Sequence, residues 1–149
     1  MSLDNFKHKL TILTKDEAQN IRNKYIELFV DIHKEYYKKY IGALKKYSDG
    51  LCYTGYLWDC IKDVVVIDLQ YVGAVSNKLN TVYALWDIHT AERIFIEDYW
   101  KFGKDSILKL DFDELMKNLE YLPEDIYIFD ENFNWTIVLT HEYIDDKRW

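Results

Sequence analysis

The feature that most restricts the fold is a pair of apolar runs near the carboxyl end, residues 126–129 and 135–142, separated by a polar segment. Apolar runs on either side of a short Asp- and Asn-containing segment are typical of a β-hairpin. Side chains of a strand repeat every two residues, so Trp135, Ile137, Leu139 and His141 share one face of the second strand. We expect that face to line the core.

A long helix is predicted in the first third of the chain, after a short strand at residues 9–13. Thr14 and Glu17 have the spacing of a capping box, which marks the amino terminus of a helix. Apolar residues then recur every three or four positions, and Asp49 and Gly50 supply a stop. Such a helix is longer than a domain of this size needs, so we expect a bend near residues 40–42. The apolar stripe comprises Ala18, Ile21, Tyr25, Leu28, Phe29, Ile32, Tyr36, Tyr40, Leu44 and Tyr47.

The middle of the chain is less regular. Residues 82–88 and 93–97 have the composition of a second hairpin, and residues 111–119 that of a short helix with acidic residues in its first turn. Residues 55–61 form a short helix or a strand, and the pattern leaves 64–67 and 71–79 undecided. A helix followed by strands, without regular βαβ alternation, predicts an α+β fold: a long, bent amino-terminal helix packed on an antiparallel sheet that ends in the hairpin.

Length and composition exclude several classes of protein. With 149 residues the chain has the size of one domain, 1–149, and it contains no apolar run long enough for a membrane span. Cys52 and Cys60 match no disulfide framework or zinc pattern, so we expect buried thiols. The first residues lack the features of a signal peptide, so a cytoplasmic location is expected. Isolated glycines and the absence of a catalytic serine motif argue against nucleotide cofactors and nucleophilic catalysis, and no cofactor is expected.

Charge and aromatic content favour a protein partner. Residues 51–149 hold 9 Lys/Arg against 19 Asp/Glu, and this acidic balance repels nucleic acid and favours basic partners. Lysines among the tyrosines of residues 33–47 resemble a nucleic-acid surface, but they also fit the solvated face of the predicted helix, which we favour. Aromatic residues make up 17% of the chain, more than one small core hides, so some should reach an interface. Self-association through the long helix is a further expectation. The candidate partner-binding residues are Tyr99, Trp100, Asp130, Glu131, Phe133, Asp145 and Asp146.

A metal site is the alternative. Asp87 and His89 alternate onto one face at the end of a predicted strand, and His141 ends another strand. Imidazole and carboxylate are ligands that a divalent ion accepts, although no spacing motif determines the geometry. The rival interpretation is a histidine hydrogen-bonded by a neighbouring carboxylate at a sheet edge.

Several segments resemble a known family. Residues 124–130, 133–136 and 140–142, together with Gly55-Tyr56-Leu57-Trp58, are similar to a family of small bacterial proteins catalogued only as a domain of unknown function. The resemblance implies a cytoplasmic single-domain protein and names no activity. Some similar small acidic proteins act as immunity partners of toxins. The tyrosine-rich first helix departs from the family's pattern.

These observations predict a non-enzymatic protein-binding module, with immunity against a toxin as one form of that function. The alternative is a small metal-dependent hydrolase in which Asp87, His89 and His141 hold the ion that activates water.

Overall fold

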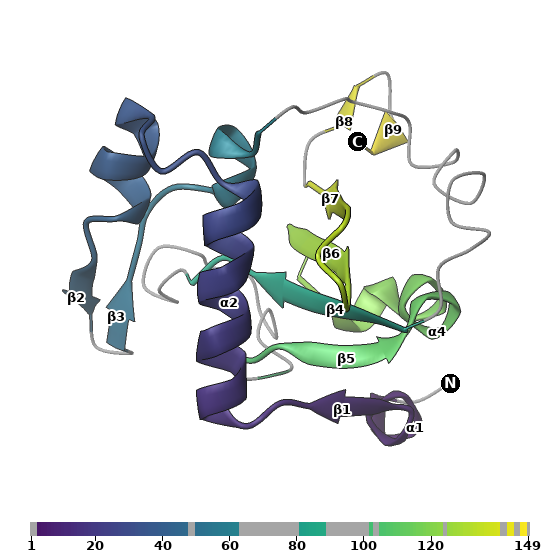
Figure 1. The fold of residues 1–149 in the computed structure, drawn as a ribbon. Coiled ribbons are helices and arrows are strands. Elements are labelled where there is room, and N and C mark those ends of the chain that lie inside the picture. The colour runs from purple at the N-terminus through teal and green to yellow at the C-terminus, as the bar shows by residue number, and fades with distance from the viewer. Residues whose placement is uncertain are drawn as a thin grey trace.

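The computed structural model describes residues 3–47, 50–62, 81–88, 102, 105–123, 125–140, 143–144 and 147–148. Within these ranges, five strands form a fully antiparallel central sheet in the order β1-β5-β4-β6-β7 (Figure 1). The α+β class expected from the sequence is therefore confirmed. The strands of the sheet are β1 (Leu10–Ile12), β4 (Thr81–Trp86), β5 (Leu108–Asp111), β6 (Ile126–Asp130) and β7 (Thr136–Leu139).

Short helices and two small hairpins surround this sheet. The α-helices are α1 (Leu3–His8), α2 (Lys15–Phe29) and α4 (Phe112–Lys117). The described residues form three further helical turns. One is the wider, π-helical η1 (Tyr37–Ile41), and two are the tighter 3-10 helices η2 (Leu57–Cys60) and η4 (Leu119–Tyr121). The small hairpins pair β2 (Lys45–Tyr47) with β3 (Gly50–Cys52), and β8 (Tyr143–Ile144) with β9 (Lys147–Arg148).

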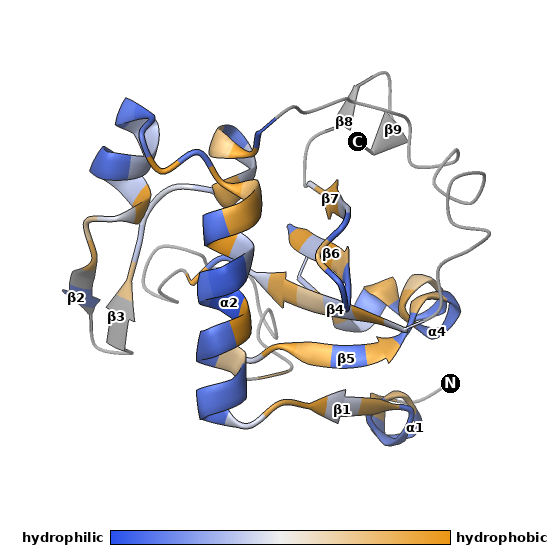
Figure 2. Ribbon diagram, viewed as in Figure 1, coloured by the Kyte–Doolittle hydropathy of each residue, from blue (hydrophilic) through white to orange (hydrophobic). Residues whose placement is uncertain are grey.

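Both faces of the sheet are buried, by different helices. Val82, Ala84 and Trp86 of β4 point to the face that α1 and α4 cover, where Phe6 and Phe112 join the same core. The alternate residue Leu85 points to the opposite face, where Tyr25 of α2 is completely buried. Each large apolar side chain buried in this way contributes about 1.5–3 kcal/mol relative to exposure. The apolar character of β4 and β5, and the mixed character of α2, are visible in Figure 2.

Several predicted elements are confirmed. Residues 10–12 form a strand, and Thr14 and Glu17 make the reciprocal capping-box bonds that start α2. Residues 126–130 and 136–139 form the carboxyl-terminal hairpin. As predicted, Trp135, Ile137 and Leu139 face one core, but Val138 packs in the other core because the sheet is covered on both sides. The short helix at 112–117 and the strand at 81–86 are also present.

The prediction of one long amino-terminal helix was wrong. Helix α2 ends at Phe29, and Val30 is extended and forms a β-bridge with Ile61. The amide of Asp31 donates to the Cys60 carbonyl at 2.8 Å, and the amide of Lys62 donates to the Phe29 carbonyl at 2.9 Å. Long-range pairing therefore satisfies the backbone where the apolar periodicity alone predicted more helix.

The residues beyond α2 continue the apolar period without continuing the helix. Tyr37–Ile41 forms the π-helical η1, and Lys45–Tyr47 is a strand rather than the helix end that Asp49 and Gly50 were expected to follow. Leu28, Ile32 and Leu44, assigned to the buried stripe, are 44%, 43% and 52% exposed. The expectation of self-association through a long helix loses that helix as its basis.

Residues 55–61, undecided from sequence, contain η2, whereas 64–67, 71–79 and 93–97 lie outside the described residues. Among the described helices, none combines the length and the apolar composition needed to cross a membrane.

Candidate functional site

A buried carboxylate lies at the end of β4. Asp87 is 3% exposed, and its Oδ1 accepts hydrogen bonds from the Tyr53 hydroxyl at 2.9 Å and the Leu57 amide at 3.0 Å. Its Oδ2 accepts from the Tyr127 hydroxyl at 2.8 Å, and that hydroxyl in turn accepts from the Trp58 amide at 2.9 Å. One carboxylate thus connects β4, β6 and the segment that leads into η2.

A buried cation lies beside this network. Arg22 of α2 is 7% exposed, and its Nη2 donates to the carbonyl of Trp86, the residue before Asp87, at 2.9 Å. Among the described residues, its buried Nη1 has no hydrogen-bond partner. Burial, followed by the charge of Asp87, raises the pKa of Tyr53 and Tyr127 well above the ordinary value, and the charge of Arg22 opposes that rise at Tyr53. Both tyrosines therefore stay protonated and donate to the carboxylate.

The metal hypothesis depends on residues that the structure describes only in part. Asp87 has the position just described, whereas His89 and His141 lie outside the described residues. Within the described ranges, no group of three His, Cys, Asp or Glu side chains is arranged to hold a metal ion. A carboxylate offers about four acceptor positions, and hydrogen bonds to described groups use three of those of Asp87.

The two cysteines are buried thiols, as predicted. The Sγ of Cys60 donates to the Leu57 carbonyl at 3.4 Å. Burial, and then the charge of Asp87, raises the pKa of this thiol to about 11. Nucleophilic cysteines need a lowered pKa and access to substrate, so Cys60 has the properties of a structural residue.

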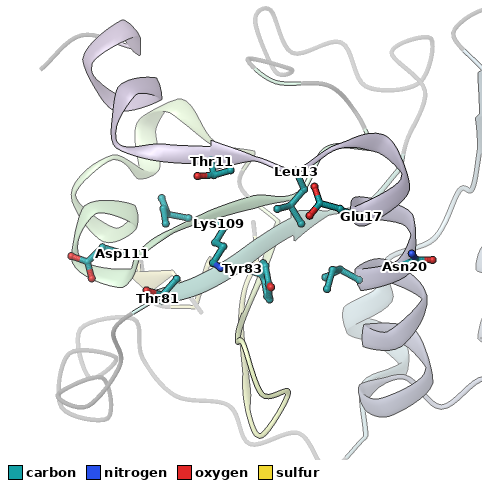
Figure 3. Close-up of a pocket in the computed structure, with 10 residues that line it drawn as sticks. Thr11, Leu13, Glu17, Asn20, Thr81, Tyr83, Lys109 and Asp111 are labelled. Carbon is teal, nitrogen blue, oxygen red and sulfur yellow. The ribbon is translucent and has the colours of Figure 1, made fainter.

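An open groove lies on the sheet face that α2 covers, beside the first turns of that helix (Figure 3). It has a volume of about 610 Å³ and lies among β1, β5, β4 and α2. Asp111 and Glu17 lie toward opposite ends of the groove, with Lys109 and Tyr83 between them (Figure 3). The lining residues are Thr11, Leu13, Glu17, Asn20, Ile21, Thr81, Tyr83, Lys109, Leu110 and Asp111.

Lys109 is the one cation among the described residues that line the groove. The Nζ of Lys109 lies 3.1 Å from the Glu131 carboxylate and 6.0 Å from the centre of the Tyr83 ring. The hydrogen bond and charge of Glu131, followed by Tyr83 and Glu17, raise the pKa of Lys109. Glu17 and Asp111 line the groove and Glu131 pairs with Lys109, so carboxylates outnumber the described lysine there and the groove is acidic.

The turn between β6 and β7 borders this groove and holds three of the predicted partner-binding residues. Glu131 is exposed and reaches Lys109. Asp130 is half-buried, and its Oδ1 accepts from the amides of Asn134 at 2.7 Å and Trp135 at 3.3 Å, which shapes the turn. Phe133 has a φ of 58° and packs on Phe129, 5.3 Å between ring centres. Asp130 and Phe133 therefore build the turn, and Glu131 pairs with the groove residue Lys109.

The other predicted partner-binding residues, Tyr99, Trp100, Asp145 and Asp146, lie outside the described residues. Sequence reasoning missed Glu17 as a groove residue because its capping role explained it, and missed Tyr83, Lys109 and Asp111 altogether. A signal was present in β5, where Lys109 and Asp111 alternate with the buried Leu108 and Leu110. Two charges on one face of a strand indicate that this part of the face is open to solvent.

No family model matches the chain, and the curated proteins and solved structures yield no match either.

Proposed function

We propose that this protein is a non-enzymatic binding module that engages a basic surface of another protein through the acidic groove. The observation that carries the proposal is an open volume of about 610 Å³ that Glu17, Asp111 and the Tyr83 ring line, with Glu131 paired to the lining residue Lys109. Carboxylates and an aromatic ring are the groups that recognise the ammonium or guanidinium of a lysine or arginine.

The groove already contains one such contact within the chain. Lys109 lies over Tyr83 and pairs with Glu131, although its side chain stays 39% exposed. A carboxylate and an aromatic ring thus already hold the ammonium of a long side chain at the groove. A partner's basic residue has Glu17 and Asp111 as further carboxylates on either side (Figure 3).

The overall charge supports the same class of partner. The net charge is −7, and such a charge speeds the approach of a basic protein and slows that of an acidic one. The resemblance to small acidic immunity partners supports one form of the proposal. In that form, this chain binds a basic toxin in the cytoplasm, as an immunity protein binds its target.

A displayed library of random peptides tests the proposal. We expect the wild-type protein to enrich peptides rich in lysine and arginine, with binding that weakens as ionic strength rises from roughly 0.05 to 0.5 M. The triple variant Glu17→Gln, Asp111→Asn, Glu131→Gln should lose this enrichment. Glutamine at position 17 can still make the capping-box bond, so α2 should keep its first turn.

The matched control removes charges elsewhere. Glu27, Glu35 and Asp113 are exposed and do not line the groove, so replacing them with Gln, Gln and Asn changes the net charge equally. The control variant should retain the basic preference. A library result without basic enrichment, or with equal enrichment by both triple variants, would contradict the proposal.

A further inference from the structure

We infer that the basic partner contributes an extended segment that adds to the outer edge of β1 as a sixth, antiparallel strand, with its cationic side chains in the acidic groove. This inference rests on the proposed function and specifies the shape and sequence pattern of the partner.

In the described part of the chain, the backbone of β1 is paired on one side only. The Leu13 amide donates to the Ile107 carbonyl at 3.0 Å, and Thr11 lies opposite Lys109 in the register of β1 with β5. In an antiparallel pair, alternate residues direct their N–H and C=O groups to the partner strand. Thr11 and Leu13 therefore face β5, and the peptide groups of Leu10 and Ile12 face outward.

Nothing in the described part of the chain pairs with that outer edge. Strand β1 ends the sheet order, and its only strand partner there is β5 (Figure 1). No hydrogen bond joins the outward groups of Leu10 or Ile12 to another described residue. An open edge of this kind is a template for an incoming strand, the mode of recognition called β-augmentation.

The two faces of β1 predict the pattern of the incoming strand. Thr11 and Leu13 line the groove, so residues added beside them on that face lie next to the acidic rim. Ile12 points to the opposite face and is 49% exposed, so an apolar residue beside it would cover this side chain. Cross-strand neighbours share a face, and the segment should therefore alternate basic and apolar residues.

Charge decides between a partner and a second copy of this chain. Pairing β1 with its own copy would bring together two chains of net charge −7 and would bring no further cation to Glu17 and Asp111 of either groove. A basic segment neutralises them. The other strands of the sheet are all paired antiparallel, and a sixth strand in the same sense keeps the twist and side-chain alternation of the sheet.

The test uses a short peptide of alternating arginine and valine with acetylated and amidated ends, its binding followed by fluorescence anisotropy. In antiparallel addition the valines lie opposite Leu10 and Ile12 and exchange hydrogen bonds with them. Methylating the backbone nitrogens of the valines should weaken binding about tenfold or more, and methylating those of the arginines should change it little. A peptide of the same composition with arginines and valines in separate blocks should bind more weakly.

Variants at position 12 test the same contact from the protein. Ile12→Pro removes an N–H that faces away from β5, and the matched control Ile12→Thr keeps it. Ile12→Pro should lose about tenfold in affinity for the alternating peptide relative to Ile12→Thr, with the native circular dichroism spectrum retained. If Ile12→Pro does not fold, the methylated peptides still test whether the partner pairs with the β1 backbone.

The outcomes separate the two proposals. One outcome is binding that depends on charge and yet is equally insensitive to methylation of the valine and the arginine backbone nitrogens. That result overturns strand addition but remains consistent with the acidic binding module. Sensitivity to arginine methylation alone indicates a parallel strand and overturns the antiparallel arrangement. Absence of binding by any basic peptide overturns both proposals, and a concentration-dependent dimer of the free protein that Ile12→Pro dissolves would assign the edge to a second copy instead.

Discussion

The hydroxyl of Tyr127 on β6 donates to Oδ2 of Asp87 at the end of β4, at 2.8 Å. The Tyr127 hydroxyl oxygen also accepts a hydrogen bond from the Trp58 amide at 2.9 Å. One buried tyrosine therefore joins the sheet to the start of η2. Asp87 was a candidate metal ligand in the sequence, and the contacts of the described residues give it a structural role: its charge is buried and held by hydrogen-bond donors.

Tyr127→Phe should destabilise the protein by about 1–3 kcal/mol, because it leaves the Trp58 amide without its acceptor and removes one donor from a buried carboxylate. Equilibrium unfolding in urea measures this change. The matched control is Tyr83→Phe, which removes the hydroxyl of a half-buried tyrosine and should cost less than about 0.5 kcal/mol. Equal free energies of unfolding for the two variants would contradict the structural role of the network.

Alkaline pH should unfold the protein. Burial raises the pKa of Tyr36 to about 12 and that of Cys60 to about 11, and it raises the pKa of Tyr53 and Tyr127 well above 10.0. Above the ordinary pKa values, the unfolded chain releases protons that the folded chain retains. The free energy of unfolding should thus be unaffected by these groups below about pH 8.5 and should fall as pH rises toward about 11.

Tyrosinate absorbance together with circular dichroism checks this prediction. Part of the tyrosine titration should coincide with loss of the native circular dichroism spectrum. Ionisation of all tyrosines near their ordinary pKa in a protein that keeps its fold would contradict the burial of these hydroxyls.

Gly55→Ala should destabilise the contact between η1 and the segment before η2. A Cβ at position 55 would lie 2.7 Å from the Tyr40 Cβ and 2.9 Å from the Tyr36 hydroxyl, and the Tyr40 Cβ cannot move without its backbone. We expect a loss of about 1–3 kcal/mol in urea unfolding. Gly42→Ala is the matched control, because its Cβ would meet the ring of Tyr37 at 3.3 Å and a ring can shift. A Gly42 variant as unstable as the Gly55 variant would show that close packing at Gly55 is not the cause.

Local chemistry made much of the fold predictable. The capping box at Thr14, the alternation of residues 135–139 and the acidic first turn of α4 are signals carried by neighbouring residues, and each corresponds to an observed element. The end of α2 was not predictable in this way. It depends on the pairing of Val30 with Ile61, residues far apart in the sequence whose contact leaves no local pattern.

The candidate site likewise has a part that the sequence predicts and a part that depends on contacts between distant residues. Acidity after residue 50 indicated a basic partner, and the Glu131 carboxylate pairs with the groove residue Lys109. Glu17 joins it only because α2 starts beside β1, and Lys109 lies between them only because β5 pairs with both β1 and β4. Sequence periodicity shows which face of a strand carries solvent-exposed side chains. The order of the strands decides which of these exposed faces lie next to each other.

Lys109→Met should tighten binding of basic peptides. Lys109 is the cation among the described lining residues, and methionine keeps most of its aliphatic stem while releasing the Glu131 carboxylate for a partner's cation. We expect the dissociation constant of the alternating arginine–valine peptide to fall roughly two- to fivefold. The stability of the fold should change little, because the Lys109 and Glu131 side chains are 39% and 45% exposed.

Two further variants separate a local effect from a change in net charge. Lys38→Met removes an equal charge from an exposed position of η1, outside the groove lining, and should leave the dissociation constant nearly unchanged. Adding Glu131→Gln to Lys109→Met should cancel the gain, because the released carboxylate is then neutral. If Lys38→Met tightens binding as much as Lys109→Met does, the peptide responds to the overall charge of the protein and the groove is not its site.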